Sequence, residues 1–216
     1  MTSNLNTNVR AYFQYEKLTS IHGKPSLLGL KTIQDQVKAN ARSVPSDSPH
    51  GHLGLVMDAT KYASIATPSP PAYVRPADPG AFTVPRGATD AVIMQLTTVY
   101  NNAARKHREV IQLEQALKNQ IIAAIEQRYL KSYINKDSGA ITFTIPELFT
   151  KLYNRWGSIH DEDVDNLEDE IRGMQYHLSD PLSDVFDKID DLATMGDAIN
   201  VPYSEKQKIK LGLAVI

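Results

Sequence analysis

The chain has 216 residues, with 23 lysines and arginines against 25 aspartates and glutamates, a formal net charge of −2 and no cysteine. The absence of cysteine excludes disulfides, thiolate nucleophiles and cysteine-ligated zinc. The length allows one large or two small domains, and no segment approaches the roughly 18 uninterrupted apolar residues of a membrane helix. Residues 1–8 are polar and lack the pattern of a secretory signal.

The charges are distributed unevenly along the chain. Residues 1–157 carry 18 basic against 11 acidic side chains, whereas residues 158–200 carry 2 against 13. This change of sign predicts two units that join near Gly157. It has two interpretations: two differently solvated surfaces, or opposite charges that orient neighbouring copies of the chain.

The N-terminal part begins with residues 1–20, which we expect to form a flexible polar arm. The apolar spacing then predicts a helix over about 26–42 and a second, short helix over 53–65. Six prolines follow between Pro68 and Pro85. Because proline removes a backbone donor and restricts the preceding residue, we predict an extended Pro-rich loop over 66–87.

The segment 89–157 has the strongest helical pattern. We predict a helix from about 89 to 134, kinked or broken near 105–108 where polar residues crowd together. Thr144 and Glu147 have the spacing of a capping box and start a further helix that ends at Gly157. The side chains expected to form the core of this first lobe are Leu117, Ile121, Ile125, Leu148, Phe149, Leu152, Tyr153 and Trp156.

The C-terminal part also has helical periodicity. We predict helices over 164–178, over 182–196 with its end at Gly196, and from a Ser204–Gln207 capping box to the apolar end of the chain. That apolar end leads us to expect either a second lobe that is incomplete at Ile216 or a C-terminal tail that is buried. Four side chains are expected to pack this lobe or to contact a second copy: Val164, Leu167, Ile171 and Met174.

Several short motifs suggest chemistry, but each fails a specific test. Asp137-Ser138-Gly139 matches an aspartic-protease signature without the preceding apolar strand, so a turn is predicted. The acidic run 161–165 resembles a calcium loop but lacks its glycine and its closing glutamate, and it is typical of a helix N-terminus. His50 and His52 have no third metal ligand at a recognisable spacing. The sequence therefore predicts no catalytic, cofactor or metal site.

One compact basic cluster, Arg105, Lys106 and Arg108, lies within the long predicted helix. Such a cluster can contact RNA phosphates. Because no aromatic residues alternate with it in the sequence, a solvated helix face is the other interpretation.

The sequence resembles the Gag polyprotein of copia-type LTR retrotransposons. The resemblance lies in Leu18–Pro25, Lys38–Ala41, His50–Met57, Val74–Gly80, Ala116–Gln120, Leu148–Gly157, Leu182–Leu192 and Pro202-Tyr203, and it covers most of residues 17–213.

The resemblance implies an all-α capsid region with two helical lobes, like the N- and C-terminal domains of retroviral and retrotransposon capsids. The first lobe (21–157) would contain the Pro-rich loop, and the second (158–216) would follow it. Such a protein would be no enzyme and would need no cofactor. It would associate with itself into cytoplasmic virus-like particles that package element RNA, and it would not bind a membrane. A Cys-x-x-Cys zinc knuckle is missing, so zinc-dependent RNA binding would involve a region absent from this chain.

Two other functions remain open. The chain could be a non-enzymatic helical adaptor, or a domesticated Gag relative, that binds partner proteins through its Pro-rich loop. It could also be a small enzyme whose site gathers histidines and carboxylates that are distant in the sequence.

Overall fold

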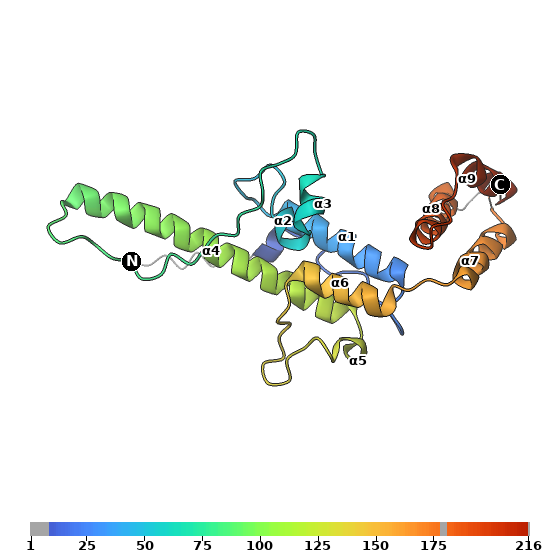
Figure 1. The fold of residues 1–216 in the computed structure, drawn as a ribbon, viewed down its shortest axis with the longest axis horizontal. Helices are drawn as coiled ribbons and strands as arrows, with labels where there is room; N and C mark the ends of the chain where they lie inside the picture. Colours follow the sequence, from blue (N-terminus) through green and yellow to red (C-terminus); the bar gives the residue numbers. More distant parts are fainter. Residues whose placement is uncertain (1–8, 178–180, 216) are drawn as a thin grey trace. The chain divides into compact units, whose positions relative to one another are not determined.

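The computed structural model describes residues 9–177 and 181–215. Among these residues every regular element is a helix, and the only β-type pairings are two isolated bridges (Figure 1). The predicted all-α fold is therefore confirmed. No helix in the described ranges is long and apolar enough to cross a membrane.

The chain divides into two compact units. Unit 1 contains the described residues up to Lys24 together with Thr32–Lys151, and unit 2 contains Pro25–Lys31 together with the described residues from Leu152 onward. Helix α1 (Leu27–Ser43) and helix α6 (Ile145–Trp156) each contribute residues to both units. The other elements of unit 1 are η1 (Val9–Tyr12), α2 (Leu53–Val56), α3 (Ala59–Ala63), α4 (Asp90–Ala124) and α5 (Gln127–Leu130).

The core of unit 1 is built from apolar stripes on helices. Their spacing of three and four residues places each stripe on one helix face, which the fold turns inward. Within this unit the largest fully buried side chains are Ile33, Leu113, Leu117, Ile121, Leu130, Ile145, Leu148 and Phe149. Ile125 is also buried, as is Leu152 in unit 2.

Of the kink or break predicted in the long helix near residues 105–108, the break is wrong. Helix α4 continues from Asp90 to Ala124. Alanine, arginine and lysine all have high helix propensity, and the Arg105 guanidinium forms an ion pair with Glu109 one turn later. A polar segment therefore marks an exposed stretch of this helix and not an interruption.

The predicted end of that helix near residue 134 is also wrong. Ile125 leaves the helical conformation and forms a parallel bridge with Ile21, whose backbone N–H donates to the Ala124 carbonyl at 2.7 Å. A segment from the N-terminal part thus binds one of the carbonyls that the helix end leaves unpaired. Helix α5 follows separately.

The prediction of one short helix over 53–65 is wrong, because this segment forms two helices, α2 and α3. The Asp58 side chain accepts a hydrogen bond from the Lys61 backbone N–H at 2.9 Å and starts α3 as a new helix. The cap at Asp58 is the reason that the segment forms two helices, and the spacing of the apolar residues alone does not indicate it.

Helix α6 starts at the predicted capping box. The Thr144 N–H donates to Glu147 Oε2 at 2.9 Å, and the Glu147 N–H donates to Thr144 Oγ1 at 3.4 Å. Along this helix Leu148, Phe149 and Leu152 are buried, whereas Tyr153 and Trp156 are half-buried. The Arg155 guanidinium lies 4.8 Å from the Trp156 ring centroid.

Unit 2 packs α7 (Asp161–Gly173), α8 (Leu182–Ala198) and α9 (Glu205–Val215) around one cluster. Helix α7 begins before residue 164, because the Asp163 carboxylate accepts the His160 N–H, and it ends at Gly173. The end predicted at 178 is therefore wrong, and Leu178 itself lies outside the described residues. Helix α8 passes through Gly196, which is buried against Val201 and Tyr203 and does not end the helix.

Candidate functional site

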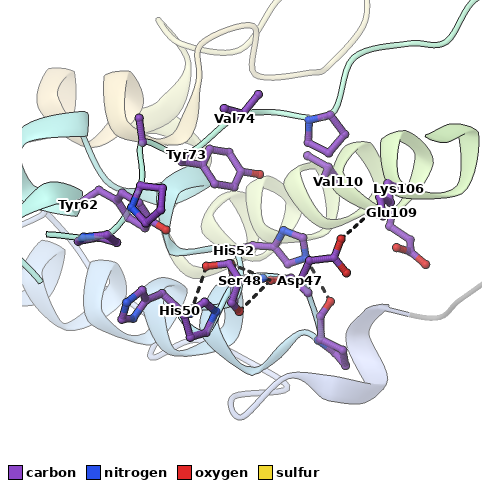
Figure 2. A pocket seen from close by; sticks show the side chains of 18 of the residues that line it. Asp47, Ser48, His50, His52, Tyr62, Tyr73, Val74, Lys106, Glu109 and Val110 are labelled. Carbon is purple, nitrogen blue, oxygen red and sulfur yellow. Dashed lines mark hydrogen bonds and ion pairs between the residues drawn. The ribbon is translucent and has the colours of Figure 1, made fainter. Parts of the chain in front are cut away.

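A pocket of about 730 Å³ lies in unit 1 (Figure 2). Three segments and one further side chain form it. The segments are the loop 45–52 after α1, the middle of α4 from Arg105 to Val110, and a stretch of the Pro-rich loop that we call the proline strap, residues 68–76. The further side chain is Tyr62 of α3. The strap covers α2 and α3 through Tyr73, described below. The pocket thus joins residues that are up to 65 positions apart in the sequence.

The loop 45–52 owes its shape to Gly51. This residue has φ +58°, and a Cβ at this position would lie 2.4 Å from the Arg42 carbonyl oxygen. Only glycine accepts both the conformation and the close approach. The backbone N–H of His52 then donates to the Ala41 carbonyl at 3.0 Å, which fixes the loop on the end of α1.

The two histidines of this loop are directed to different partners. His52 is buried, and its Nε2 lies 3.4 Å from the Pro45 carbonyl oxygen. Burial lowers the pKa of His52, so the ring is neutral near pH 7. The His50 ring meets Tyr62 edge to face, with centroids 6.4 Å apart. Neither arrangement is that of a metal chelate, and the described residues contain no group of three His, Cys, Asp or Glu that could hold a metal ion.

Tyr73 holds the proline strap against α2 and α3. A Cβ on Gly54 of α2 would lie 2.2 Å from the Tyr73 Cβ, and the Tyr73 ring meets the buried Tyr62 ring at 6.3 Å. The Tyr73 hydroxyl oxygen is buried and has no hydrogen-bond partner among the described residues. Burial raises the pKa of Tyr73, so the hydroxyl remains protonated.

An ion-pair network ties the strap to α4. Arg75 Nη2 lies 2.6 Å from Glu114 Oε2, and Lys118 Nζ lies 2.7 Å from Glu114 Oε1. Glu114 is only 8% exposed. A buried carboxylate requires such partners, and two cations share this one.

The far end of the pocket is polar. Lys106 pairs with Asp47, and Arg105 Nη1 lies 2.8 Å from Glu109 Oε1. The Lys106 ammonium lowers the pKa of Asp47 through its hydrogen bond and its charge. Of the predicted basic cluster, Arg105 and Lys106 line the pocket, whereas Arg108 is exposed and does not line it.

The other predicted residues lie elsewhere. Val164 and Ile171 are buried in the core of unit 2, with Leu167 and Met174 packed against it. Asp137 and Ser138 form a turn in which Asn135 Oδ1 accepts both of their N–H groups. Asp161, Asp163 and Asp165 lie in the exposed N-terminal turns of α7.

The pocket itself was not predicted from the sequence. The only signals for it are Gly51 between the two histidines and the tyrosine within the prolines, and neither indicates that the two segments meet on α4. Chemically, the pocket offers aromatic and proline walls at one end and two exposed ion pairs at the other. Comparison with family models, with curated proteins and with solved structures finds no match for this chain.

Proposed function

We propose that this chain is a Gag-like capsid protein of a copia-type retrotransposon, which self-associates into a shell that packages element RNA. The proposal rests on the sequence resemblance described above and on one structural observation. That observation is an exposed apolar face on α8 and α9 of unit 2.

The face is formed by apolar side chains of α8 and α9 that are exposed and do not pack in the core of unit 2. Phe186 is 51% exposed and Leu213 is 71% exposed, and they are accompanied by Leu182 and Ile209. Phe186 lies beside α9, because a Cβ on Gly212 would be in ordinary contact with Phe186 Cε1, at 3.9 Å. We call Leu182, Phe186, Ile209 and Leu213 the α8–α9 face. Exposed apolar side chains on neighbouring helices are typical of interaction sites.

The charges beside this face favour a second copy as its occupant. Helix α8 carries the acidic residues Asp184, Asp187, Asp190, Asp191 and Asp197 against Lys188, whereas α9 carries Lys206, Lys208 and Lys210 against Glu205. A two-fold pairing that sets α8 of one copy against α9 of the other brings opposite charges together around an apolar centre.

The experiment is size-exclusion chromatography with light scattering over a concentration and salt series. The unaltered chain is compared with Phe186→Glu and with a control, Val201→Glu, which alters a 55% exposed side chain in the loop after α8. We expect concentration-dependent oligomers that Phe186→Glu weakens by about tenfold or more, because it places a carboxylate at the centre of the contact. The control should associate like the unaltered chain.

Equal association of all three chains would exclude the α8–α9 face as the contact. Stoichiometric binding of a partner protein by a chain that stays monomeric would favour the adaptor function.

A further inference from the structure

We infer that the pocket of unit 1 receives an unpaired base of single-stranded RNA, with the adjoining phosphates at Arg105 and Lys106. The inference rests on the proposed function, because it assigns the RNA contact to a site on this chain. The sequence places no aromatic residue within the basic cluster. The fold supplies what the sequence lacks, since it brings His50, Tyr62 and Tyr73 into the same pocket as the cluster.

The apolar end of the pocket suits a flat ring. His50 meets Tyr62 and Tyr62 meets Tyr73 in edge-to-face contacts, with centroids 6.4 Å and 6.3 Å apart. Proline rings of the strap complete the wall. Aromatic side chains beside a basic surface are the usual means of binding single-stranded nucleic acid without strict sequence preference. The volume of about 730 Å³ lies in the range of ligand pockets and is sufficient for a base with its sugar.

The polar end suits a phosphate at the mouth. Figure 2 shows Tyr62 at one end of the pocket, Lys106 and Glu109 at the other, and Tyr73 and His52 between them. The carboxylates of Asp47 and Glu109 already pair with Lys106 and Arg105, and they would repel a phosphate placed deep inside. Both pairs are exposed, so a phosphodiester at the mouth can compete for the two cations at little cost.

The charge of unit 1 also supports a nucleic-acid ligand. Residues 1–24 and 32–151 contain 16 basic against 11 acidic side chains, and this positive excess attracts a polyanion.

The test uses the full chain and a 12-nucleotide single-stranded RNA that carries one 2-aminopurine. Binding is measured by fluorescence anisotropy, and base insertion by quenching of the 2-aminopurine. The pocket variant is Arg105→Gln with Lys106→Gln, and its matched control is Lys131→Gln with Lys136→Gln, which removes two exposed charges of unit 1 outside the pocket.

We expect the pocket variant to bind RNA about tenfold more weakly. Loss of two phosphate contacts should also reduce, by about 1.4, the magnitude of the slope of log K against the logarithm of the salt concentration. The control should change the affinity by less than about threefold. Tyr73→Leu should abolish the quenching, and Tyr73→Phe should retain most of it. Circular dichroism checks that Tyr73→Leu remains folded. If it does not, the charge variants, which alter exposed side chains, still decide the result.

Three results would overturn the inference: equal weakening by the pocket and control variants, no quenching at saturation, or binding of double-stranded RNA as tight as that of the single strand. A fourth result would also overturn it. If Pro-rich peptides bind the pocket more tightly than RNA does, and if they alone displace the RNA, the pocket belongs to a protein partner.

Light scattering on RNA-free samples separates this inference from the proposed function. If the chain forms oligomers but shows no base insertion, the proposed RNA site is wrong and the proposed self-association stands. If a strict monomer shows base insertion, the proposed self-association is wrong and the RNA site stands.

Discussion

The side-chain amides of Asn40 and Gln120 are joined across unit 1. Asn40 Nδ2 donates to Gln120 Oε1 at 3.0 Å, from α1 to α4, although the two residues are 80 positions apart. Both amides also bind the backbone of Tyr15: Asn40 Oδ1 accepts the Tyr15 N–H at 2.7 Å, and Gln120 Nε2 donates to the Tyr15 carbonyl at 3.0 Å. The described part of the N-terminal arm is thereby fixed between two helices.

Asn40→Ala should destabilise the protein by about 2–3 kcal/mol, because it leaves the part-buried Tyr15 N–H and the Oε1 of buried Gln120 without partners. The matched control is Gln36→Ala, which removes an exposed hydrogen-bonded pair with Thr19 and should cost less than about 1 kcal/mol. Urea denaturation measures both. Equal costs would show that the buried amide network has no special role.

Gly51→Ala should destabilise unit 1 by about 3 kcal/mol or more. The added Cβ requires an unfavourable positive φ, and it also meets the Arg42 carbonyl at 2.4 Å. Gly139→Ala is a suitable control, because Gly139 has φ +66° but open space around its Cβ position. The control should reduce the free energy of unfolding by only about 1–2 kcal/mol, because only the positive φ is unfavourable there. A cost for Gly51→Ala no greater than that of the control would refute the close approach to α1.

Arg75→Gln should loosen the proline strap. The change removes one of the two cations that pair with the buried Glu114 carboxylate, and Lys118 then neutralises it alone. We expect limited proteolysis within the strap to accelerate several-fold. Arg86→Gln, which removes an exposed charge farther along the same loop, should be cleaved at the rate of the unaltered chain. An unchanged rate for both variants would mean that Tyr73 alone holds the strap.

The stability of unit 2 should fall in acid partly through Glu168. The hydrogen bond from the Tyr203 hydroxyl, at 2.5 Å, and then the Arg172 guanidinium lower the pKa of Glu168. Because the folded-state pKa is lowered, this stabilisation is complete above the unfolded-state value near 4.5 and disappears as the pH falls through the lowered value.

The same contact acts in the opposite sense in alkali. Burial and the Glu168 hydrogen bond raise the pKa of Tyr203 to about 12, so its stabilisation is complete below the unfolded-state value of 10 and disappears as the pH rises through 12. Because the Tyr203 hydroxyl is the main cause of the lowered pKa of Glu168, Tyr203→Phe should reduce the loss of melting temperature between pH 7 and pH 3 by a few degrees. Thermal unfolding followed by circular dichroism tests this expectation, and an identical pH dependence in the variant would contradict it.

Local sequence signals predicted the local features of the fold. The Thr144–Glu147 and Ser204–Gln207 capping boxes both form, because each depends on residues three positions apart. The turn at Asp137–Gly139 has the same local origin. By contrast, the end of α4 at Ala124 depends on a bridge to Ile21, about a hundred residues earlier, which no local pattern reveals.

The candidate site could be predicted only in fragments. Arg105, Lys106, His50 and His52 were all singled out in the sequence, but for separate reasons and not as one site. Their convergence depends on the close approach at Gly51 and on the packing of Tyr73 against Gly54. Both contacts arise only in the folded chain, so the spacing of residues in the sequence does not indicate them.

Self-association of this chain can be measured by sedimentation of the purified protein from micromolar to several hundred micromolar. We expect a mass that rises reversibly above the 24.0 kDa of one chain, with rings or shells in negative-stain micrographs of the most concentrated samples. A mass of 24.0 kDa at every concentration would exclude self-association of this chain.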